Sequence, residues 1–403
     1  MSQSPRLPVL ARRGALALGL GSLAACSLPQ RGPAVPRGQT GRASVLSLAN
    51  ARFFPALGSG PIVAEFAAAM ERRRSFMGTR AGEMMPPLDL LAISGGGDDG
   101  AFGAGLLNGW TAAGTRPEFS LVTGVSTGGL IAPFAFLGPA YDAGLRRVYT
   151  ESTLADILVQ RSLLNAVFND GLADTTPLFR TISRELDEPM MAAIAEGYRQ
   201  GRLLLIGTTD LDAQLPVIWN IGAIAASGHP GGRELIHRIM LASASIPGAF
   251  APVLFDVTVD GVPHQELHVD GGAVNQAFLY PIAVTQARRA RIARRLPVQP
   301  IRAWVIRNAK LDANWASTSR RTMSIAGRAV ETMIAASGFN DVTRIWLNAE
   351  RDDVEYRLAF IGPEFDVPYT TPFNPDYMRP LFENGYARAR GGFDWSRRPP
   401  LVE

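Results

Sequence analysis

The stretch LDLLAISGGGDDGAFGAGLLNGW, residues 88–110, joins a short apolar run, a glycine-rich loop and a longer apolar segment. The first run has the length of a buried strand, and the segment 101–110 has the character of a helix. A second unit of the same kind follows, with a predicted strand at 119–124 and a predicted helix at 129–137. This alternation predicts an α/β fold, a three-layer α/β/α sandwich with a mostly parallel central sheet.

Further elements extend this pattern along the chain of 403 residues. Apolar runs predict strands at 202–210, 216–221, 266–270 and 301–308, and helical patterns predict helices at 61–76 and 321–348. The segment after residue 362 contains seven prolines, at 363, 368, 372, 375, 380, 399 and 400. Because proline interrupts regular structure, we expect this tail to be irregular.

Composition and charge exclude several classes of protein. Hydrophobic residues make up 47% of the chain and charged residues 19%, which excludes intrinsic disorder. The formal net charge is +4, and Arg6, Arg12 and Arg13 are the only charged residues in 1–25, so the chain without that segment carries 4 − 3 = +1. A nearly neutral chain lacks the basic surface typical of nucleic-acid binding, so no nucleic-acid partner is expected.

The amino-terminal segment has the pattern of a targeting signal. Residues 1–13 carry the three arginines, and 14–25 form an uncharged apolar run that is too short to span a bilayer. The run ends in LAAC, and Cys26 is the only cysteine in the chain. This end resembles the lipobox of bacterial lipoproteins, so we expect a signal peptide at 1–25 and lipidation of Cys26. A plain secretory signal with an incidental cysteine is the alternative.

The lipoprotein interpretation also predicts where the protein is located. Ser27, rather than an aspartate, follows the cysteine, and by resemblance to lipoproteins of Gram-negative bacteria this implies an outer-membrane anchor facing the periplasm. Residues 26–60 are rich in proline, glycine, serine and arginine. Such a composition predicts a flexible tether between the lipid and the folded part.

The glycine loop at 95–100, GGGDDG, allows three interpretations. It contains a G-x-G-x-x-G pattern between a strand and a helix, which is typical of dinucleotide binding. Asp98 and Asp99 would place negative charge where a pyrophosphate must lie, and this disfavours a nucleotide. The same backbone geometry can stabilise an oxyanion through convergent N–H groups, and a tight structural turn is the third interpretation.

A second loop, GVSTG at 124–128, also follows a predicted strand and precedes a predicted helix. This is the setting of a nucleophile elbow, in which a sharp turn exposes the hydroxyl of Ser126. Gly124 and Gly128 are expected to be required because side chains there would collide within the turn. The motif predicts a serine nucleophile.

A serine nucleophile needs a base. Asp270 ends the predicted strand 266–270 and is followed by two glycines, which leave room for a hydroxyl to approach. A buried carboxylate can act as a base when burial raises its proton affinity. The alternative is His268 with an earlier acid such as Asp210, and an ordinary Asp-Gly turn also remains open.

Taken together, the motifs SGGGDDGAFGAGLL, GVSTGG and VDGG, with TTDLDAQLPVIWN at 208–220 and ASASIPGAFAPV at 242–253, resemble those of the patatin-like phospholipases over roughly residues 86–310. The resemblance implies a Ser126/Asp270 dyad, with the amides of Gly95, Gly96 and Gly97 as the oxyanion hole. Supporting positions in the motifs are Gly100, Gly124, Gly128, Gly271 and Gly272. Asp99 departs from the family pattern, which commonly has a basic residue there.

The expected function is that of a serine lipid acyl hydrolase of the phospholipase A, lysophospholipase or esterase type. The resemblance implies an acyl lipid or ester substrate, no organic cofactor and no metal. It assigns residues 61–310 to the catalytic domain, with the motif core at 86–310, and 311–403 to a helical and irregular extension packed on it. Two alternatives stay open: a non-catalytic lipid-binding envelope lipoprotein with this fold, and a nucleotide-binding oxidoreductase.

Overall fold

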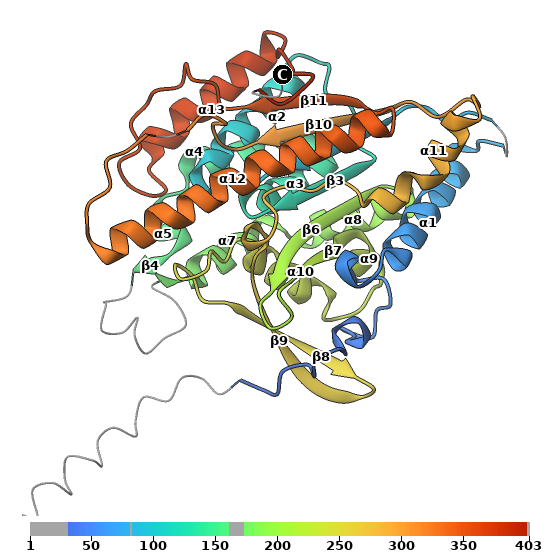
Figure 1. Cartoon of the computed structure of the whole chain (residues 1–403), viewed down its shortest axis with the longest axis horizontal. Helices are drawn as coiled ribbons and strands as arrows, with labels where there is room; N and C mark the ends of the chain where they lie inside the picture. The colour runs from blue at the N-terminus through green and yellow to red at the C-terminus, as the bar shows by residue number, and fades with distance from the viewer. Residues whose placement is uncertain (1–30, 81–82, 161–172, 314, 401–403) are drawn as a thin grey trace, which may run out of the picture.

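The computed structural model describes residues 31–80, 83–160, 173–313 and 315–400 (Figure 1). These residues form a nine-stranded sheet in the order β1-β7-β6-β3-β2-β10-β11, with β9 paired to β6 and β8 to β9. The strands are β1 (Arg52–Phe53), β2 (Leu88–Ile93), β3 (Leu121–Val125), β6 (Leu203–Asp210), β7 (Leu215–Asn220), β8 (Val253–Val259), β9 (Val262–Asp270), β10 (Ile301–Arg307) and β11 (Glu355–Phe360). A separate small sheet joins β4 (Val159–Gln160) to β5 (Ala173–Asp174).

The α-helices alternate with the strands along the chain. They are α1 (Gly60–Met77), α2 (Gly100–Ala112), α3 (Thr127–Leu137), α4 (Asp142–Glu151), α5 (Leu154–Ile157), α7 (Thr176–Glu185), α8 (Glu188–Arg199), α9 (Ile221–Ala226), α10 (Gly232–Ser243), α11 (Gln286–Ala293), α12 (Thr322–Arg351) and α13 (Pro375–Arg390). Strands β6, β3, β2, β10 and β11 run parallel, whereas β7 and β9 each run antiparallel to β6. The predicted sandwich with a mostly parallel sheet is confirmed.

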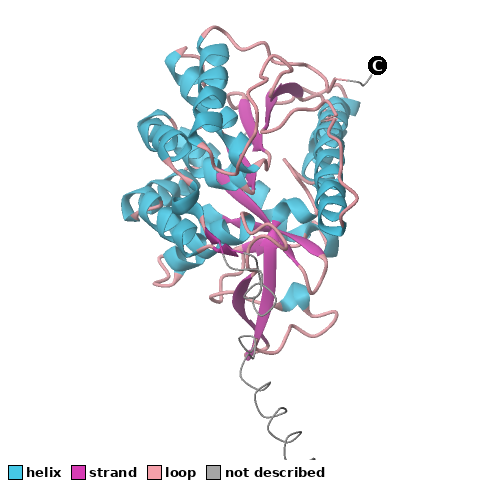
Figure 2. Ribbon diagram, turned by 90° about the vertical axis from the view of Figure 1, so that its left-hand side faces the viewer, coloured by secondary structure: helices cyan, strands magenta, loops and turns pink. Residues whose placement is uncertain are grey.

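Side chains of the central strands alternate between two apolar cores. In β2, Leu91 and Ile93 belong to the core shared with α2, α3, α8, α10 and α13, whereas Leu90 and Ala92 belong to the core shared with α1 and α12. Successive side chains of a strand point to opposite faces, so a run that is apolar throughout is buried on both. Figure 2 shows the resulting arrangement, with strands between helices on either side.

The carboxyl ends of the parallel strands carry the loops that matter for function. The chain leaves β2 into the glycine loop and leaves β3 at Ser126. Asp270 is the last residue of β9, and it pairs with Thr208 near the carboxyl end of β6. The sheet therefore brings three segments, distant in sequence, to one edge.

The expectation of a flexible tether at 26–60 is wrong for residues 31–60, which the structure describes. Val45, Ala51 and Phe53 are buried, and β1 pairs with β7 at the edge of the main sheet. The segment is rich in proline and glycine, and this composition led to the prediction of a flexible tether. Its scattered apolar residues are nevertheless buried against the rest of the fold, and their burial holds the segment in place. Cys26 and the predicted signal peptide at 1–25 lie outside the described residues.

The expectation of an irregular tail after residue 362 is also wrong, because α13 spans 375–390. Pro375 lies at the start of this helix, where its missing N–H costs nothing, and the Asn374 side chain caps the amide of Asp376. The helix lies directly against α2: side chains at Gly105 and Gly109 would be 1.9 and 2.2 Å from backbone oxygens of α13. Small residues four apart on one face of α2 thus permit this close packing.

The carboxyl-terminal segment also completes the sheet, because β11 pairs in parallel with β10. Within the described residues, none of the helices combines the length and apolar character required to cross a bilayer.

Candidate active site

Ser126 occupies a strained turn between β3 and α3. Its φ is 55° and its ψ is −129°, a conformation that side-chain-bearing residues rarely adopt. A side chain at Gly124 would lie 2.3 Å from the Gly128 carbonyl oxygen, and one at Gly128 would lie 2.2 Å from that of Ile93. Both glycines are therefore required by close backbone approach, as the nucleophile elbow predicts.

A buried serine holds this turn in place. The amide of Ser126 donates to the hydroxyl of Ser243 at 3.0 Å, and that hydroxyl donates to the Gly207 carbonyl at 2.8 Å. Ser243 lies at the end of α10, so its hydroxyl ties the elbow to a helix and to β6. Reasoning from the sequence missed Ser243, because nothing local to 243 indicates which amide it would accept.

Asp270 lies next to the serine. The structure brings the two side chains into hydrogen-bonding contact, and Asp270 Oδ1 also accepts the Gly272 amide at 2.7 Å. Burial raises the pKa of Asp270 to about 7, although the hydrogen bonds from Ser126 and Gly272 oppose that rise. A side chain at Gly271 would lie 2.6 Å from the Gly207 carbonyl oxygen, so this glycine permits the approach of β9 to β6.

The glycine loop lies against the serine, but one of its predicted donors is already used. A side chain at Gly95 would be 3.2 Å from the Ser126 Cβ, so the loop does contact the elbow. However, the Gly95 amide donates to the Gln276 carbonyl at 3.0 Å, which removes it from the predicted oxyanion hole. Among the described residues, no acceptor bonds the amides of Gly96 or Gly97, so these two remain as candidates.

The loop is fixed by residues that the motifs did not reveal. A side chain at Gly96 would lie 2.0 Å from the Asn308 carbonyl oxygen, and the Asn308 side chain bonds both Ser94 and the Gly103 amide. Arg307 donates to the Gly95 carbonyl at 3.3 Å. Arg307 ends β10 and Asn308 follows it at the same sheet edge as the loop, so their position after a buried strand was the available signal.

The two aspartates of the loop bind the carboxyl-terminal segment. Asp98 accepts the Phe373 amide, and Asp99 accepts the Tyr377 hydroxyl at 2.6 Å. Burial raises the pKa of Asp99 to about 6, and the nearby charges of Arg307 and Lys310 limit the rise. Asp99 therefore joins the loop to α13 at the position where the family pattern has a basic residue.

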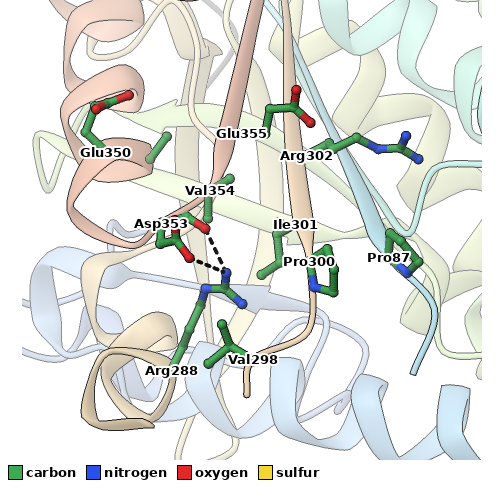
Figure 3. A pocket seen from close by; sticks show the side chains of 11 residues that line it. Pro87, Arg288, Val298, Pro300, Ile301, Arg302, Glu350, Asp353, Val354 and Glu355 are labelled. Carbon is green, nitrogen blue, oxygen red and sulfur yellow. Dashed lines mark hydrogen bonds and ion pairs between the residues drawn. The ribbon is translucent and has the colours of Figure 1, made fainter. Parts of the chain in front are cut away.

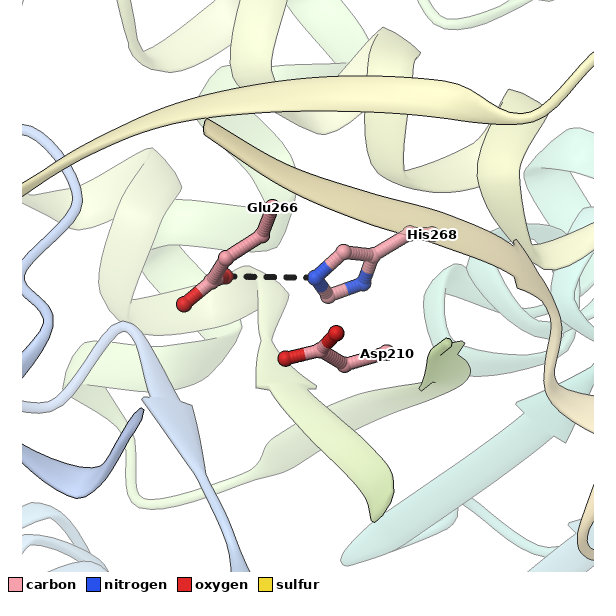
Figure 4. A group of neighbouring side chains, drawn as sticks. All are labelled: Asp210, Glu266 and His268. Atoms are coloured by element: carbon pink, nitrogen blue, oxygen red, sulfur yellow. Dashed lines mark hydrogen bonds and ion pairs between the residues drawn. The ribbon is translucent and has the colours of Figure 1, made fainter. Parts of the chain in front are cut away.

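The alternative base, His268, forms its hydrogen bonds with residues other than the serine. Its Nε2 lies 3.2 Å from Glu266 (Figure 4). Its Nδ1 lies 2.9 Å from the Thr208 hydroxyl, so both ring nitrogens have other partners. The structure does bring His268 and Asp210 together, but their hydrogen bonds do not include Ser126 or Asp270. This arrangement disfavours the His268 alternative.

Asp210, Glu266 and His268 form a buried group whose ligand atoms all lie within 4.8 Å of one another, close enough for a metal ion. Arg52 competes for the same place, because its guanidinium forms two hydrogen bonds with the Glu266 carboxylate. Burial alone would raise the pKa of Glu266, but hydrogen bonds from His268 and Arg52 hold it below its ordinary value. The residues fit an ion-paired network better than a metal centre, because a cation would oppose the Arg52 charge.

An apolar cavity adjoins the site. Gly97 from the glycine loop and Thr127, next to the nucleophile, lie on its wall. The remaining lining is mostly apolar and comes from Leu130, Phe134, Val148, Tyr149, Ile157, Leu178, Ile182, Leu186, Phe373 and Met378, with Ser152, Thr181 and Glu185. The cavity has a volume of about 60 Å³, and its apolar lining suits a small hydrocarbon group.

A second cavity lies at the opposite end of the sheet (Figure 3). It is lined by the first residues of β10 and β11, Ile301 and Glu355, and by Pro87 just before β2. Arg288 projects into it, donates to the Asp353 carbonyl at 2.7 Å and lies 3.8 Å from that residue's carboxylate. Ligands in parallel α/β sheets bind at the carboxyl ends of the strands, so this cavity is not the candidate site.

Comparison with known proteins gives a family match for part of the chain. Residues 91–283 match the family model of the patatin-like phospholipases, which supports lipid acyl hydrolysis as the general class of activity. A crystal structure of VipD from Legionella pneumophila is similar at 11% sequence identity, over 78% of this chain and 68% of that chain, with a TM-score of 0.36. The search of curated proteins found no match. Residues 91–283 of this chain are thus similar to the patatin-like phospholipases.

Proposed function

We propose that this protein is a serine lipid acyl hydrolase that uses Ser126 as nucleophile and Asp270 as base. The observation that carries the proposal is the contact between the strained Ser126 and a buried carboxylate whose pKa burial raises to about 7. A carboxylate with an ordinary pKa would be too weak a base to activate a hydroxyl. Burial gives Asp270 the proton affinity that this role needs.

The proposed reaction proceeds through an acyl-enzyme. Ser126 Oγ attacks the ester carbonyl carbon while its proton passes to Asp270, and the oxyanion is held by the amides of Gly96 and Gly97. The leaving alcohol takes the proton from Asp270 as the C–O bond breaks. Water then attacks the acyl-enzyme, again giving its proton to Asp270, and release of the fatty acid returns the proton to Ser126.

The pH dependence of hydrolysis tests the role of Asp270. The base must be ionised, and burial places its pKa at about 7. We therefore expect kcat/KM for a short p-nitrophenyl ester to rise about tenfold per pH unit up to pH 7 and to level off above it. The profile is measured between pH 5 and pH 9 at a wavelength where the phenol and phenolate absorb equally.

Asp99 provides the control for that profile, because burial raises its pKa to about 6. If the rising limb reports the ionisation of Asp270, the Asp99→Asn variant keeps a rising limb near pH 7, even if its maximal kcat/KM differs from that of the parent. If the rising limb disappears in Asp99→Asn, the titrating group is Asp99 of the glycine loop and not Asp270. A parent profile that is flat from pH 5 to pH 9 would contradict a base with a raised pKa.

We further propose that Cys26 is acylated and anchors the protein to the outer membrane on its periplasmic side. The LAAC sequence at 23–26, the arginines before it and the absence of any other cysteine support this proposal. We expect a radiolabelled fatty acid to be incorporated into the parent chain in a Gram-negative host and not into Cys26→Ser. Label in both proteins would contradict acylation at this cysteine.

A further inference from the structure

The first half of α12 extends beyond the packed body of the protein. Every described side chain between 321 and 337 is solvent-accessible, whereas Asp341, Val342 and Ile345 in the second half are buried. In Figure 1 this amino-terminal half, in orange, reaches past the labelled strands of the sheet. We call residues 322–337 the projecting half-helix.

The projecting half-helix is amphipathic. Its large apolar residues Ile325, Val330, Met333 and Ile334 are 53%, 45%, 62% and 37% exposed. At 100° per residue they fall, with the alanines between them, on about half of the helix circumference, and Arg328 and Glu331 lie on the other half. An apolar face of this kind on a packed helix would be buried in a core, and none of the core residues within the described ranges covers it.

The carboxyl-terminal end of the projecting half-helix lies beside the candidate active site. The guanidinium of Arg307 occupies the place where a side chain at Gly338 would lie, 2.4 Å from its Cβ, and the same guanidinium bonds the Gly95 carbonyl. Glu331 acts electrostatically on Tyr369, which hydrogen bonds to Asp98 of the glycine loop. The half-helix therefore lies beside the sheet edge that carries Ser126, with Glu331 of its polar side toward the glycine loop.

Charge and aromatic character at the start of α12 favour an anionic surface. Arg320 and Arg321 are exposed, and neither caps the helix with its side chain. Cations are unfavourable at a helix amino terminus, so these arginines do not stabilise α12. Trp315 is 87% exposed five residues earlier, and tryptophan and arginine are the residues that settle at a bilayer interface.

We propose that the projecting half-helix, together with Trp315, Arg320 and Arg321, is a docking surface for an anionic lipid bilayer. The half-helix lies in the plane of the interface with its apolar face among the acyl chains and the arginines at the head groups. This inference rests on the proposed function, since docking there brings lipid esters to the edge of the sheet that carries Ser126. In this proposal α12 presents the lipid substrate, and the Ser126/Asp270 dyad carries out the hydrolysis.

A single reporter on the helix tests docking directly. Cys26 is the only cysteine, so the full chain carrying Cys26→Ser and Met333→Cys takes one environment-sensitive dye at position 333. The matched control carries Leu347→Cys, a residue of the packed half that is 55% exposed in the same helix. With phosphatidylcholine vesicles containing phosphatidylglycerol, we expect emission at 333 to brighten and shift to the blue, and emission at 347 to stay unchanged.

The reporter also distinguishes the other occupants of this face. Equal responses at both positions, or none at 333, would overturn the proposal. Blue-shifted emission at 333 without vesicles would mean that the face is already covered, and a dependence of that emission on protein concentration would identify a second copy of the chain. Pure phosphatidylcholine should give a weaker response than the anionic mixture, and an equal one would refute the role of the arginines.

Hydrolysis separates docking from chemistry. We expect Met333→Asp to lower the rate on anionic vesicles at least tenfold and to leave hydrolysis of a soluble short-chain ester unchanged, with Leu347→Asp unchanged on both. Equal loss on both substrates would point to damage at the site and contradict a docking role. If the parent hydrolyses neither substrate, the proposed function fails, and the dye response still decides whether the half-helix docks.

Discussion

The Asp270→Asn variant is expected to lose about 10⁴-fold in kcat/KM for ester hydrolysis. Asparagine has nearly the shape of aspartate and can still accept the Gly272 amide, but it cannot take the proton of the Ser126 hydroxyl. Ser126→Ala should lose at least as much, because no acyl-enzyme can form. The rates are measured on a short and a medium-chain p-nitrophenyl ester.

Two controls make this result interpretable. Residues that act as a unit are not additive, so the double variant should be no slower than the slower single one. The folded-state pKa of Asp270 lies above its ordinary value of 3.8, so its ionisation lowers the parent's stability as the pH rises from about 4 to about 7. Asp270→Asn should therefore unfold at pH 8 no more easily than the parent. A folded Asp270→Asn variant within tenfold of parental activity would contradict the dyad.

The second large effect concerns stability. Arg52→Met is expected to lower the free energy of unfolding by about 3–5 kcal/mol, because it removes the guanidinium from the buried Glu266 carboxylate and leaves it only the hydrogen bond with His268. The side chains of Arg52 and Glu266 are 5% and 1% exposed, and Arg52 also donates to the Ala43 carbonyl at 2.9 Å. Urea denaturation of parent and variant at pH 7 measures the difference.

An exposed pair and a double variant provide the comparisons. Arg199 and Glu196 are 3.0 Å apart on the surface of α8, both more than half exposed, and Arg199→Met should leave the stability nearly unchanged. Adding Glu266→Gln to Arg52→Met should recover much of the loss, since the unpaired charge is gone. If Arg52→Met proves no worse than Arg199→Met, the amino-terminal segment does not hold the fold through this ion pair.

The sequence predicted the features that depend on neighbouring residues. The buried runs that form β2, β3, β6 and β10 are mostly apolar because both faces of the sheet are covered. The elbow at Ser126 was recognisable because its strain and its glycines lie within five residues. The roles of Ser126 and Asp270 remain predictions, which the contact between them supports.

The features that were missed depend on long-range contacts. The Gly95 amide was assigned to the oxyanion hole because only tertiary structure brings the Gln276 carbonyl to it. The helix α13 was hidden by its prolines, whose cost is offset by its packing on the glycines of α2. Ser243 and Asn308 bind amides more than 100 residues away, so no local pattern showed which amides they contact.

The most direct test of the account is to locate the covalent adduct that forms with an alkyl phosphonate ester, which traps an activated serine. The account predicts one adduct per chain, on the peptide that contains Ser126, and much slower labelling in Asp270→Asn because the hydroxyl is no longer activated. An adduct on another residue, or ester hydrolysis by a chain in which Ser126 stays unmodified, would contradict it.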